Sequence, residues 1–284
     1  MLVNLNEIFK IANERQIAVG AFNVPTLEMV RAVIKAAEKL DCPVILQHAE
    51  GHNKFISMEE IAHIMLYYAK NTKVPVCIHL DHGTKIEDCK KAIDLGFTSV
   101  MFDGSMYSYD ENIELTKKVI ELAHEKNVTV EAELGPMLNS SIGAGEGVSY
   151  TSTTYQYTEV SEAQDFINKT NVDCLAIAIG TMHGIYLEKP KLNLNRILEI
   201  KEATEIPLVL HGGSGLSVEE YKTAVKNGIR KINYYTYMNT DGGKAVKDYL
   251  VDDKVYIFFD ELSIFATDRI EENVTEFMRT ISTI

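Results

Sequence analysis

Short apolar runs alternate with longer segments of helical spacing along most of this chain. The apolar runs have the length of strands and span residues 17–24, 42–49, 74–82, 98–104, 127–135, 172–180, 206–213 and 229–236. In the intervening segments apolar residues recur every three or four positions, as on one face of an amphipathic helix. These segments span residues 26–40, 58–71, 85–96, 112–127, 160–170, 193–204 and 217–228. The pattern predicts eight strands, each followed by a helix or a C-terminal helical region.

Strands that are apolar throughout indicate a parallel sheet covered by helices on its faces. Eight strand–helix units in 284 residues favour an α/β fold of the (β/α)8 TIM-barrel type, with residues 1–284 forming a single domain. An open Rossmann-type sheet is the main alternative, but no G-x-G-x-x-G follows the first strand. One segment at about 136–157 is rich in Gly, Ser and Thr and is expected to be a long loop at the catalytic face of the barrel.

Charge and composition narrow the class of partner. A formal charge of −13 argues against nucleic acid, because phosphate backbones need clustered Lys and Arg. A small phosphorylated ligand stays compatible, since a helix N-terminus can bind one phosphate. No apolar run approaches the roughly 20 residues of a membrane helix, and the first residues do not resemble a signal peptide. The four cysteines form no C-x-x-C pair, which favours reduced thiols and a cytoplasmic location.

Polar residues gather where the predicted strands end, which is the catalytic end of a barrel of this type. The set comprises Asn23, Asp81, His82, Asp103, Ser105, Glu131, Glu133, His183, His211, Asn233 and Thr236. His82, His183 and His211 come from three different strands, and each is followed by Gly. Three protein ligands with an open fourth position are typical of a catalytic zinc. A hydrogen-bonded structural histidine is the alternative for each residue taken alone.

The stretch "HLDHG" contains a second histidine and an aspartate. His79 and His82 are separated by an odd number of positions, so on a strand they point to opposite faces, and His79 is expected to be structural. Asp81 beside a metal would serve as an acid or base, whereas the alternative is a cap on the next helix.

Glycines follow the seventh predicted strand in "LHGGSG". Gly212 and Gly213 would let backbone N–H groups approach a ligand, and the helix after Ser214 would favour an anion. Together with "KINYYT" at the eighth strand, they predict a phosphate site built by the last two strand–helix loops.

These residues resemble the class II, metal-dependent ketose-bisphosphate aldolases. The motifs "GAFNV", "HLDHG", "FDGS", "VEAELG", "IGTMHG", "LVLHGGSG" and "KINYYT" occur in the order and at the spacing of that family. The resemblance implies that His82, His183 and His211 hold one catalytic Zn²⁺ per subunit and that Asp81 exchanges a proton with the C4 hydroxyl of the ketose. It places Asp103 and Glu133 at an alternative metal position. It also implies contacts with dihydroxyacetone phosphate or the rest of the substrate from Asn23, Gly184, Gly212, Ser214, Asn233 and Thr236.

The resemblance also has implications for the second acid or base, for a further cofactor and for the assembly of subunits. The family's second acid or base comes from a glycine-rich loop, and the matching stretch "NSSIGAGEGV" lacks its Asp, so Glu146 is the candidate. A solvent-exposed glutamate is the alternative. A monovalent cation is a further expected cofactor, and the family implies a homodimer or homotetramer.

The sequence departs from the family on the side of the aldehyde product. Ala49 stands where the family usually has Ser, and His52 where it has a small residue, so His48 and His52 are candidates for new substrate contacts. The basic stretch that binds a second phosphate is absent, and Arg269 is the nearest candidate. The expected reaction is reversible cleavage of a fructose- or tagatose-bisphosphate-like ketose, or of a ketose phosphate with another terminal group, in carbohydrate metabolism such as glycolysis. A non-catalytic sugar-phosphate-binding subunit and a zinc hydrolase are the alternatives.

Overall fold

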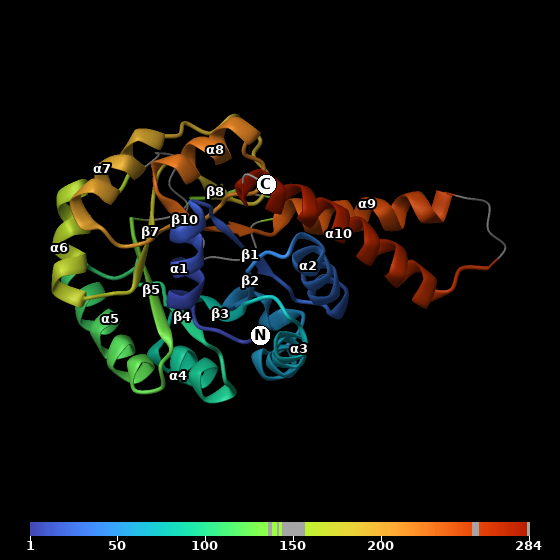
Figure 1. The fold of residues 1–284 in the computed structure, drawn as a ribbon, viewed down its shortest axis with the longest axis horizontal. Coiled ribbons are helices and arrows are strands. Elements are labelled where there is room, and N and C mark those ends of the chain that lie inside the picture. Colours follow the sequence, from blue (N-terminus) through green and yellow to red (C-terminus); the bar gives the residue numbers. More distant parts are fainter. Residues whose placement is uncertain (136–137, 141, 144–156, 252–255, 283–284) are drawn as a thin grey trace.

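Eight parallel strands close into a barrel (Figure 1). The computed structural model describes the chain except residues 136–137, 141, 144–156, 252–255 and 283–284. Around the barrel the strands follow the order β1-β10-β9-β7-β5-β4-β3-β2. They are β1 (Val19–Asn23), β2 (Val44–Ala49), β3 (Val76–Gly83), β4 (Ser99–Phe102), β5 (Thr129–Leu134), β7 (Cys174–Ile177), β9 (Leu208–Leu210) and β10 (Ile229–Tyr234). The eight predicted strands and the TIM-barrel fold are confirmed.

Helices follow the strands and surround the barrel (Figure 1). They are α2 (Leu27–Leu40), α3 (Met58–Asn71), α4 (Ile86–Leu95), α5 (Tyr109–His124), α6 (Val160–Thr170), α7 (Leu194–Thr204) and α8 (Val218–Asn227). At the starts of α2, α3, α5, α7 and α8, a side chain accepts a hydrogen bond from a backbone N–H group that has no partner inside the helix. Ser57, Ser108 and Ser217 each form a capping box with the glutamate three positions later. The helical periodicity of apolar residues in the sequence located these helices to within a few residues.

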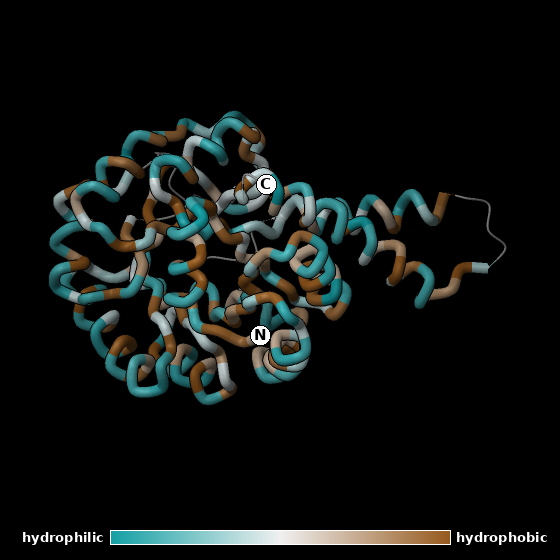
Figure 2. The backbone as a smooth tube through the Cα atoms, in the orientation of Figure 1, coloured by the Kyte–Doolittle hydropathy of each residue, from teal (hydrophilic) through white to brown (hydrophobic). Residues whose placement is uncertain are grey.

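Helix α1 (Leu5–Arg15) closes the N-terminal end of the barrel. Its buried residues include Leu5, Ile8 and Phe9, and they form one apolar cluster with inward-facing Ile45 and Val209 of the strands. A larger cluster lies between the strands and the outer helices, and hydrophobic residues alternate with hydrophilic ones along those helices in Figure 2. Apolar packing therefore fills one end of the barrel, and the polar strand-end residues are confined to the other.

Short elements cover the C-terminal end of the barrel. The 3-10 helix η1 (Glu50–Lys54) follows β2, and β6 (Leu138–Asn139) pairs in parallel with β8 (Met182–His183). Most of the loop predicted at about 136–157 lies outside the described residues. The four cysteines are free and buried. Among the described helices, none is long and apolar enough to cross a membrane.

The helices α9 (Thr236–Val251) and α10 (Phe259–Ser282) form an arm that projects from the barrel (Figure 1). The C-terminal part of α10 anchors this arm. The ring of Phe277 stacks on Tyr234 at a centroid distance of 3.9 Å and meets Phe22 edge-on at 5.7 Å. Because Phe22 lies on β1 and Tyr234 on β10, one side chain of α10 covers the junction of the first and last barrel strands.

Removal of this anchor should destabilise the fold. We expect Phe277→Ala to lower the free energy of unfolding by about 3–5 kcal/mol, the usual cost of deleting a buried aromatic ring. Urea unfolding followed by circular dichroism measures it. Phe55→Ala removes an exposed ring from η1's C-terminal side and should cost less than about 1 kcal/mol. Equal losses in the two variants would contradict the proposed anchoring.

Candidate active site

The end of β3 brings two adjacent side chains to the same site. Successive strand residues normally face opposite sides of a sheet, so Asp81 and His82 should diverge. The ladder between β3 and β4 shifts register between Leu80 and Gly83, and His82 has a left-handed backbone with φ of 49°. This bulge turns the His82 ring toward the barrel axis beside Asp81, with 4.0 Å between Nε2 and the Asp81 Oδ1. A non-glycine residue in this conformation is strained, which is common at functional sites.

His82, His183 and His211 converge at the C-terminal end of the barrel, as the sequence predicted. All three are buried, and each places one ring nitrogen within 4.8 Å of the others. His82 Nε2 lies 3.0 Å from His211 Nδ1, and the His183 ring meets the His82 ring edge-on at 4.9 Å. Side chains from three separate strands therefore direct imidazole nitrogens at one small volume.

A second group with the character of a metal site shares His82. It consists of His82, Asp103 and Glu133, whose ligand atoms also lie within 4.8 Å of one another. His82 Nδ1 is 2.8 Å from the Asp103 Oδ2 and 3.9 Å from the Glu133 Oε2. Ser105 fixes the other Asp103 oxygen by donating from its backbone N–H and its hydroxyl. The structure thus places Asp103 and Glu133 together beside the first group.

The electrostatics of this site favour a cation. Burial and the neighbouring Asp103 raise the pKa of Glu133 well above its ordinary value, and its Oε2 has no hydrogen-bond partner in the described part of the chain. Although burial opposes a charged ring, the carboxylates of Asp81 and Asp103 raise the pKa of His82 to about 10. Burial lowers the pKa of His183 and of His211. The carboxylates that stabilise a proton on His82 are equally suited to stabilise a divalent metal ion, which histidine and carboxylate side chains commonly bind.

Three amide side chains hold Asp81. Asn23 and Gln47 donate to its Oδ2 at 2.9 and 3.2 Å, and Asn233 donates to its Oδ1 at 3.0 Å. Although burial alone would raise it, nearby His82 and His211 keep the pKa of Asp81 well below its ordinary value. An ionised carboxylate accepts hydrogen bonds only, so it orients the three NH2 groups toward itself. Their amide oxygens then face away, and none has a partner among the described residues.

Beneath the histidines lies a fully buried ion pair. Lys231 Nζ is 2.8 Å from the Glu131 Oε2, and the other Glu131 oxygen is 2.7 Å from His211 Nε2. His79 lies beside them, with Nε2 3.6 Å from Glu131 and Nδ1 2.9 Å from the Ser99 hydroxyl. His79 is therefore a structural histidine, as expected. Sequence reasoning missed Lys231 and Gln47, although a lysine within a predicted barrel strand was a usable signal.

The glycine-rich segment after β9 is packed against the end of β10. Gly212 has a left-handed φ of 62°, and a Cβ there would lie 2.5 Å from the Met182 carbonyl oxygen. A Cβ on Gly213 would lie 2.8 Å from the Asn233 carbonyl oxygen. The Ser214 hydroxyl accepts a hydrogen bond from the Tyr235 N–H at 3.1 Å. This hydrogen bond joins the loops after β9 and β10. Gly184 and Thr236, which the sequence also predicted as substrate contacts, are buried.

The predicted residue Glu146 lies outside the described residues. The predicted residue Arg269 does not join this cluster. Arg269 is exposed on α10, where its guanidinium pairs with Glu272 at 3.1 Å. His48 and His52 are buried at the rim, on β2 and η1.

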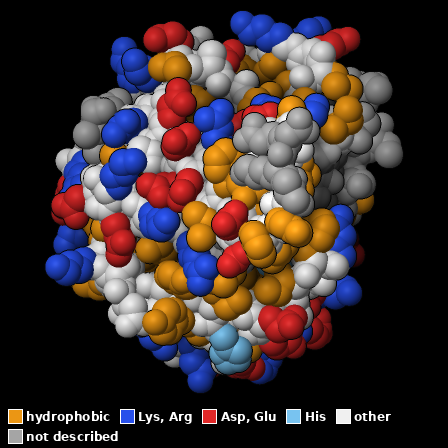
Figure 3. All heavy atoms as spheres, turned by 90° about the vertical axis from the view of Figure 1, so that its right-hand side faces the viewer, with side chains coloured by type: hydrophobic (Ala, Val, Ile, Leu, Met, Phe, Trp, Pro, Cys, Tyr) orange, Lys and Arg blue, Asp and Glu red, His pale blue; other side chains and the backbone are white. Residues whose placement is uncertain are grey.

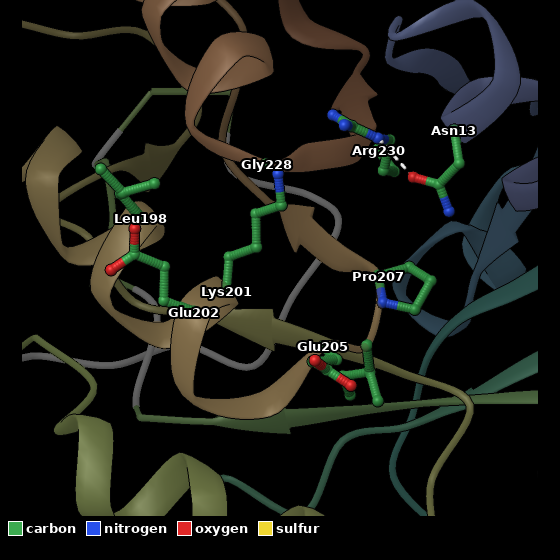
Figure 4. A pocket seen from close by; sticks show the side chains of 9 residues that line it. Asn13, Leu198, Lys201, Glu202, Glu205, Pro207, Gly228 and Arg230 are labelled. Atoms are coloured by element: carbon green, nitrogen blue, oxygen red, sulfur yellow. Dashed lines mark hydrogen bonds between the residues drawn. The ribbon is translucent and has the colours of Figure 1, made fainter.

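A separate hollow of about 440 Å³ lies near the N-terminal ends of β9 and β10 (Figure 4). Arg230, which lines it, donates to Asn13, to Gln16 and to the carbonyls of Val225 and Ile229. Active sites of TIM barrels lie at the opposite, C-terminal end of the strands, whereas this hollow lies at the N-terminal end, which contributes to stability. The candidate active site is the histidine and carboxylate cluster.

Comparison with known proteins agrees with this geometry. A family model described as "Fructose-bisphosphate aldolase class-II" matches residues 3–283. The chain belongs to that family. It is 41% identical to a fructose-bisphosphate aldolase of Staphylococcus aureus (strain Mu50 / ATCC 700699) over 256 residues, covering 89% of this chain and 87% of the relative. A fructose-bisphosphate aldolase of Geobacillus stearothermophilus is 40% identical over the same length and with the same coverage.

A solved structure extends the likeness over nearly the whole chain. The YdjI aldolase of Escherichia coli K12 superposes with a TM-score of 0.87 at 33% identity, covering 99% of this chain and 97% of that one. The chain is therefore a class II aldolase, a lyase that carries out retro-aldol cleavage. This family is generally zinc-dependent, and the two candidate metal groups of the aldolase fit that chemistry.

The buried ion pair of the aldolase can be tested separately from its chemistry. Glu131→Gln should leave the Lys231 ammonium without a counter-charge and cost about 3–5 kcal/mol of unfolding free energy. The double variant Glu131→Gln/Lys231→Met should recover most of that loss. Urea titrations at neutral pH measure both. A double variant as unstable as Glu131→Gln alone would contradict this explanation.

Proposed function

We propose that this aldolase binds one Zn²⁺ per subunit through His82, His183 and His211 and cleaves a phosphorylated ketose into dihydroxyacetone phosphate and an aldehyde. The observation that supports this most directly is the convergence of three buried imidazoles beside an ionised aspartate. Asp103 and Glu133 would offer the ion an alternative position, with His82 common to both. A bound divalent ion would supply Lewis-acid stabilisation for negative charge that develops on the ketose oxygens.

Asp81 is the proposed proton carrier at the C4 hydroxyl. Its carboxylate is ionised, buried and held in one orientation by three amides, so it is prepared to accept a proton without reorganising. Accepting that proton would allow the C3–C4 bond to break and the aldehyde to form. In the condensation direction Asp81 would return the proton to the aldehyde oxygen. The resemblance to the family assigns the later protonation at C3 to Glu146.

The phosphate of dihydroxyacetone phosphate would bind at the loops after β8, β9 and β10. Gly212 and Gly213 leave no room for side chains, so backbone N–H groups stay accessible there. Ser214 precedes the N-terminus of α8, and Thr236 is the first residue of α9. Helix N-termini favour anions, which supports a phosphate site with Gly184, Asn233 and Asn23 as further substrate contacts.

The substrate class follows from the relatives and from the site. Curated relatives are named fructose-bisphosphate aldolases, so we propose a ketose phosphate of six-carbon size as substrate. His48 and His52 would lie at the aldehyde end, beyond Asp81. We also infer a single-domain cytoplasmic enzyme, with a monovalent cation as an additional cofactor.

The arm supports a homodimer or homotetramer. Its outer part exposes several large apolar side chains, which gather on the face shown in Figure 3. They are Leu250, Val251, Tyr256, Ile257, Phe258, Phe259, Ile264 and Phe265. Contiguous apolar surface of this kind usually marks a protein interface, and a second copy of the chain is the partner that the family implies.

Metal binding and proton transfer should separate by mutation. We expect His211→Ala to lose zinc and turnover together, because one of three ligands is removed. Asp81→Ala should retain zinc and lose at least about 100-fold in kcat, since general acid–base catalysis contributes that much. Zinc content by elemental analysis and kcat with fructose 1,6-bisphosphate or tagatose 1,6-bisphosphate as substrate are the measurements.

His63→Ala provides the control for this pair, because His63 is exposed on α3. It should keep both zinc and turnover. Equal zinc loss in Asp81→Ala and His211→Ala would refute the division of roles.

The interface can be tested by placing charge on the arm. Wild-type protein should show a molar mass that is a multiple of 31.9 kDa in light scattering. Phe259→Glu combined with Ile264→Glu should shift it toward the monomer, because both side chains are exposed and apolar in one subunit. Tyr67→Glu on α3 is the matched exposed control and should leave the mass unchanged. A monomeric wild type would rule out the assembly.

A further inference from the structure

An imidazole with no hydrogen-bond partner is buried at the rim of the active site. His52, on η1, is fully buried, and within the described part of the chain neither of its ring nitrogens has a partner. An unsatisfied buried polar group costs roughly 1–3 kcal/mol, so such a ring is usually completed by water or by a ligand. His48 lies close by, with Nε2 3.1 Å from the Asn53 Oδ1 and with Nδ1 unpartnered in the same described region.

The segment that carries His52 is fixed over the site. Glu50 accepts hydrogen bonds from the N–H and the hydroxyl of Thr84, at 3.0 and 2.8 Å, which joins η1 to the segment after β3. The His52 ring packs against Tyr235 with centroids 4.8 Å apart and lies 6.3 Å from the His48 ring. Asp81 and His82 are close enough for their charges to act on the His52 pKa. His52 is thus held at the rim of the barrel, on a segment that is hydrogen-bonded to Thr84, directly after β3.

The position of the ring identifies the part of the substrate that it would meet. With the phosphate at the loops after β9 and β10 and the C4 hydroxyl at Asp81, the carbons beyond C4 extend past Asp81 toward β2 and η1. Ala49, opposite Asp81 in the β2–β3 ladder, is too small to contact them. Among the described residues, the polar side chains next to Ala49 along this rim are His48 on β2 and His52 on η1.

The hydrogen-bonding character of this rim matches hydroxyl groups. Burial lowers the pKa of His52 to about 4, so the ring is neutral near pH 7 and offers one donor and one acceptor. The amide oxygens of Gln47 and Asn23 are unpartnered acceptors in the described chain and need donors. A hydroxyl donates and accepts, whereas a phosphate dianion only accepts and would leave these oxygens unpaired.

Cations that could bind a terminal phosphate are not directed into this rim. Lys54 is exposed, and its ammonium lies over the Phe55 ring at 4.9 Å from the centroid. Arg269 is exposed on α10 and paired with Glu272. Among the described residues, the groups around His52 are therefore neutral or acidic, apart from His82 of the candidate metal site and the exposed Lys54.

We infer that the rim formed by His48, His52 and Gln47 selects an aldehyde end that carries uncharged hydroxyl groups, so that the preferred substrate is a ketose 1-phosphate rather than a 1,6-bisphosphate. This inference rests on the proposed aldolase function and adds the class of the terminal group. His52 is its specificity-determining residue.

Competing substrates test the inference on zinc-loaded protein. The kcat/KM for fructose 1-phosphate and tagatose 1-phosphate should exceed that for the matching 1,6-bisphosphates by about tenfold or more, the discrimination given by one or two buried hydrogen bonds. His52→Phe keeps an aromatic ring and removes both polar atoms. It should shift the ratio of the two efficiencies toward the bisphosphate by about tenfold, and His52→Gln should restore part of the preference.

Two exposed residues provide matched controls. His63→Phe and Lys54→Gln should leave the preference for the 1-phosphate unchanged. A wild type that prefers the bisphosphate, with that preference lost in Lys54→Gln, would show that Lys54 binds a terminal phosphate and would overturn the inference. An unchanged ratio in His52→Phe would also overturn it.

Deuterium exchange separates this inference from the function on which it rests. Dihydroxyacetone phosphate alone should exchange a C3 proton with heavy water in the presence of the wild-type enzyme, because that step needs no aldehyde. Exchange without any preference for the 1-phosphate overturns the terminal-group assignment alone. Absence of exchange overturns the proposed function and this assignment together.

Discussion

The buried contact of Lys231 with Glu131 supports the rest of the active site. Glu131 carries a charge in the barrel interior, and only a neighbouring cation makes that charge tolerable there. With one oxygen neutralised by Lys231, the other is free to hold His211 Nε2, which directs His211 Nδ1 at His82. A carboxylate that orients the imidazole from behind is a common support for metal-binding histidines. The orientation of His211 toward His82 thus depends on the ion pair of Lys231 and Glu131 beneath them.

The bulge at the end of β3 solves a second problem. The proposed proton carrier Asp81 and the proposed metal ligand His82 must face the same site, yet neighbouring strand residues point apart. The left-handed His82 removes that conflict at the expense of backbone strain. Three amides from β1, β2 and β10 then hold Asp81 against its tendency to move toward His82. The site is therefore organised before any substrate is present.

The two ends of the barrel have separate tasks. α1 and the apolar cluster beneath the strands close the N-terminal end, so side chains there contribute packing. At the other end, charged and amide side chains replace that packing, and hydrogen bonds between the loops after β9 and β10 keep them in place.

Much of the fold could be read from the sequence because periodicity is a local property. Alternating apolar runs and helical spacing located the eight strands and the helices between them, and the order of polar strand ends indicated His82, His183 and His211. Local patterns cannot show which strand residues face each other across a barrel. The pairing of Lys231 with Glu131 spans 100 residues, and the Gln47 contact with Asp81 joins two strands.

The tertiary structure also decided the details that alternation would misplace. Asp81 and His82 share a site only because a bulge reverses the expected direction of one side chain. His52 is a polar residue on the short helix η1, and only the closed barrel shows that it is buried with no hydrogen-bond partner among the described residues. The sequence by itself indicated the fold and the candidate metal ligands, since these depend on residue type and periodicity, and its resemblance to a known family indicated the reaction type. Orientation, burial and charge balance arise from distant contacts, so only the folded barrel determined them.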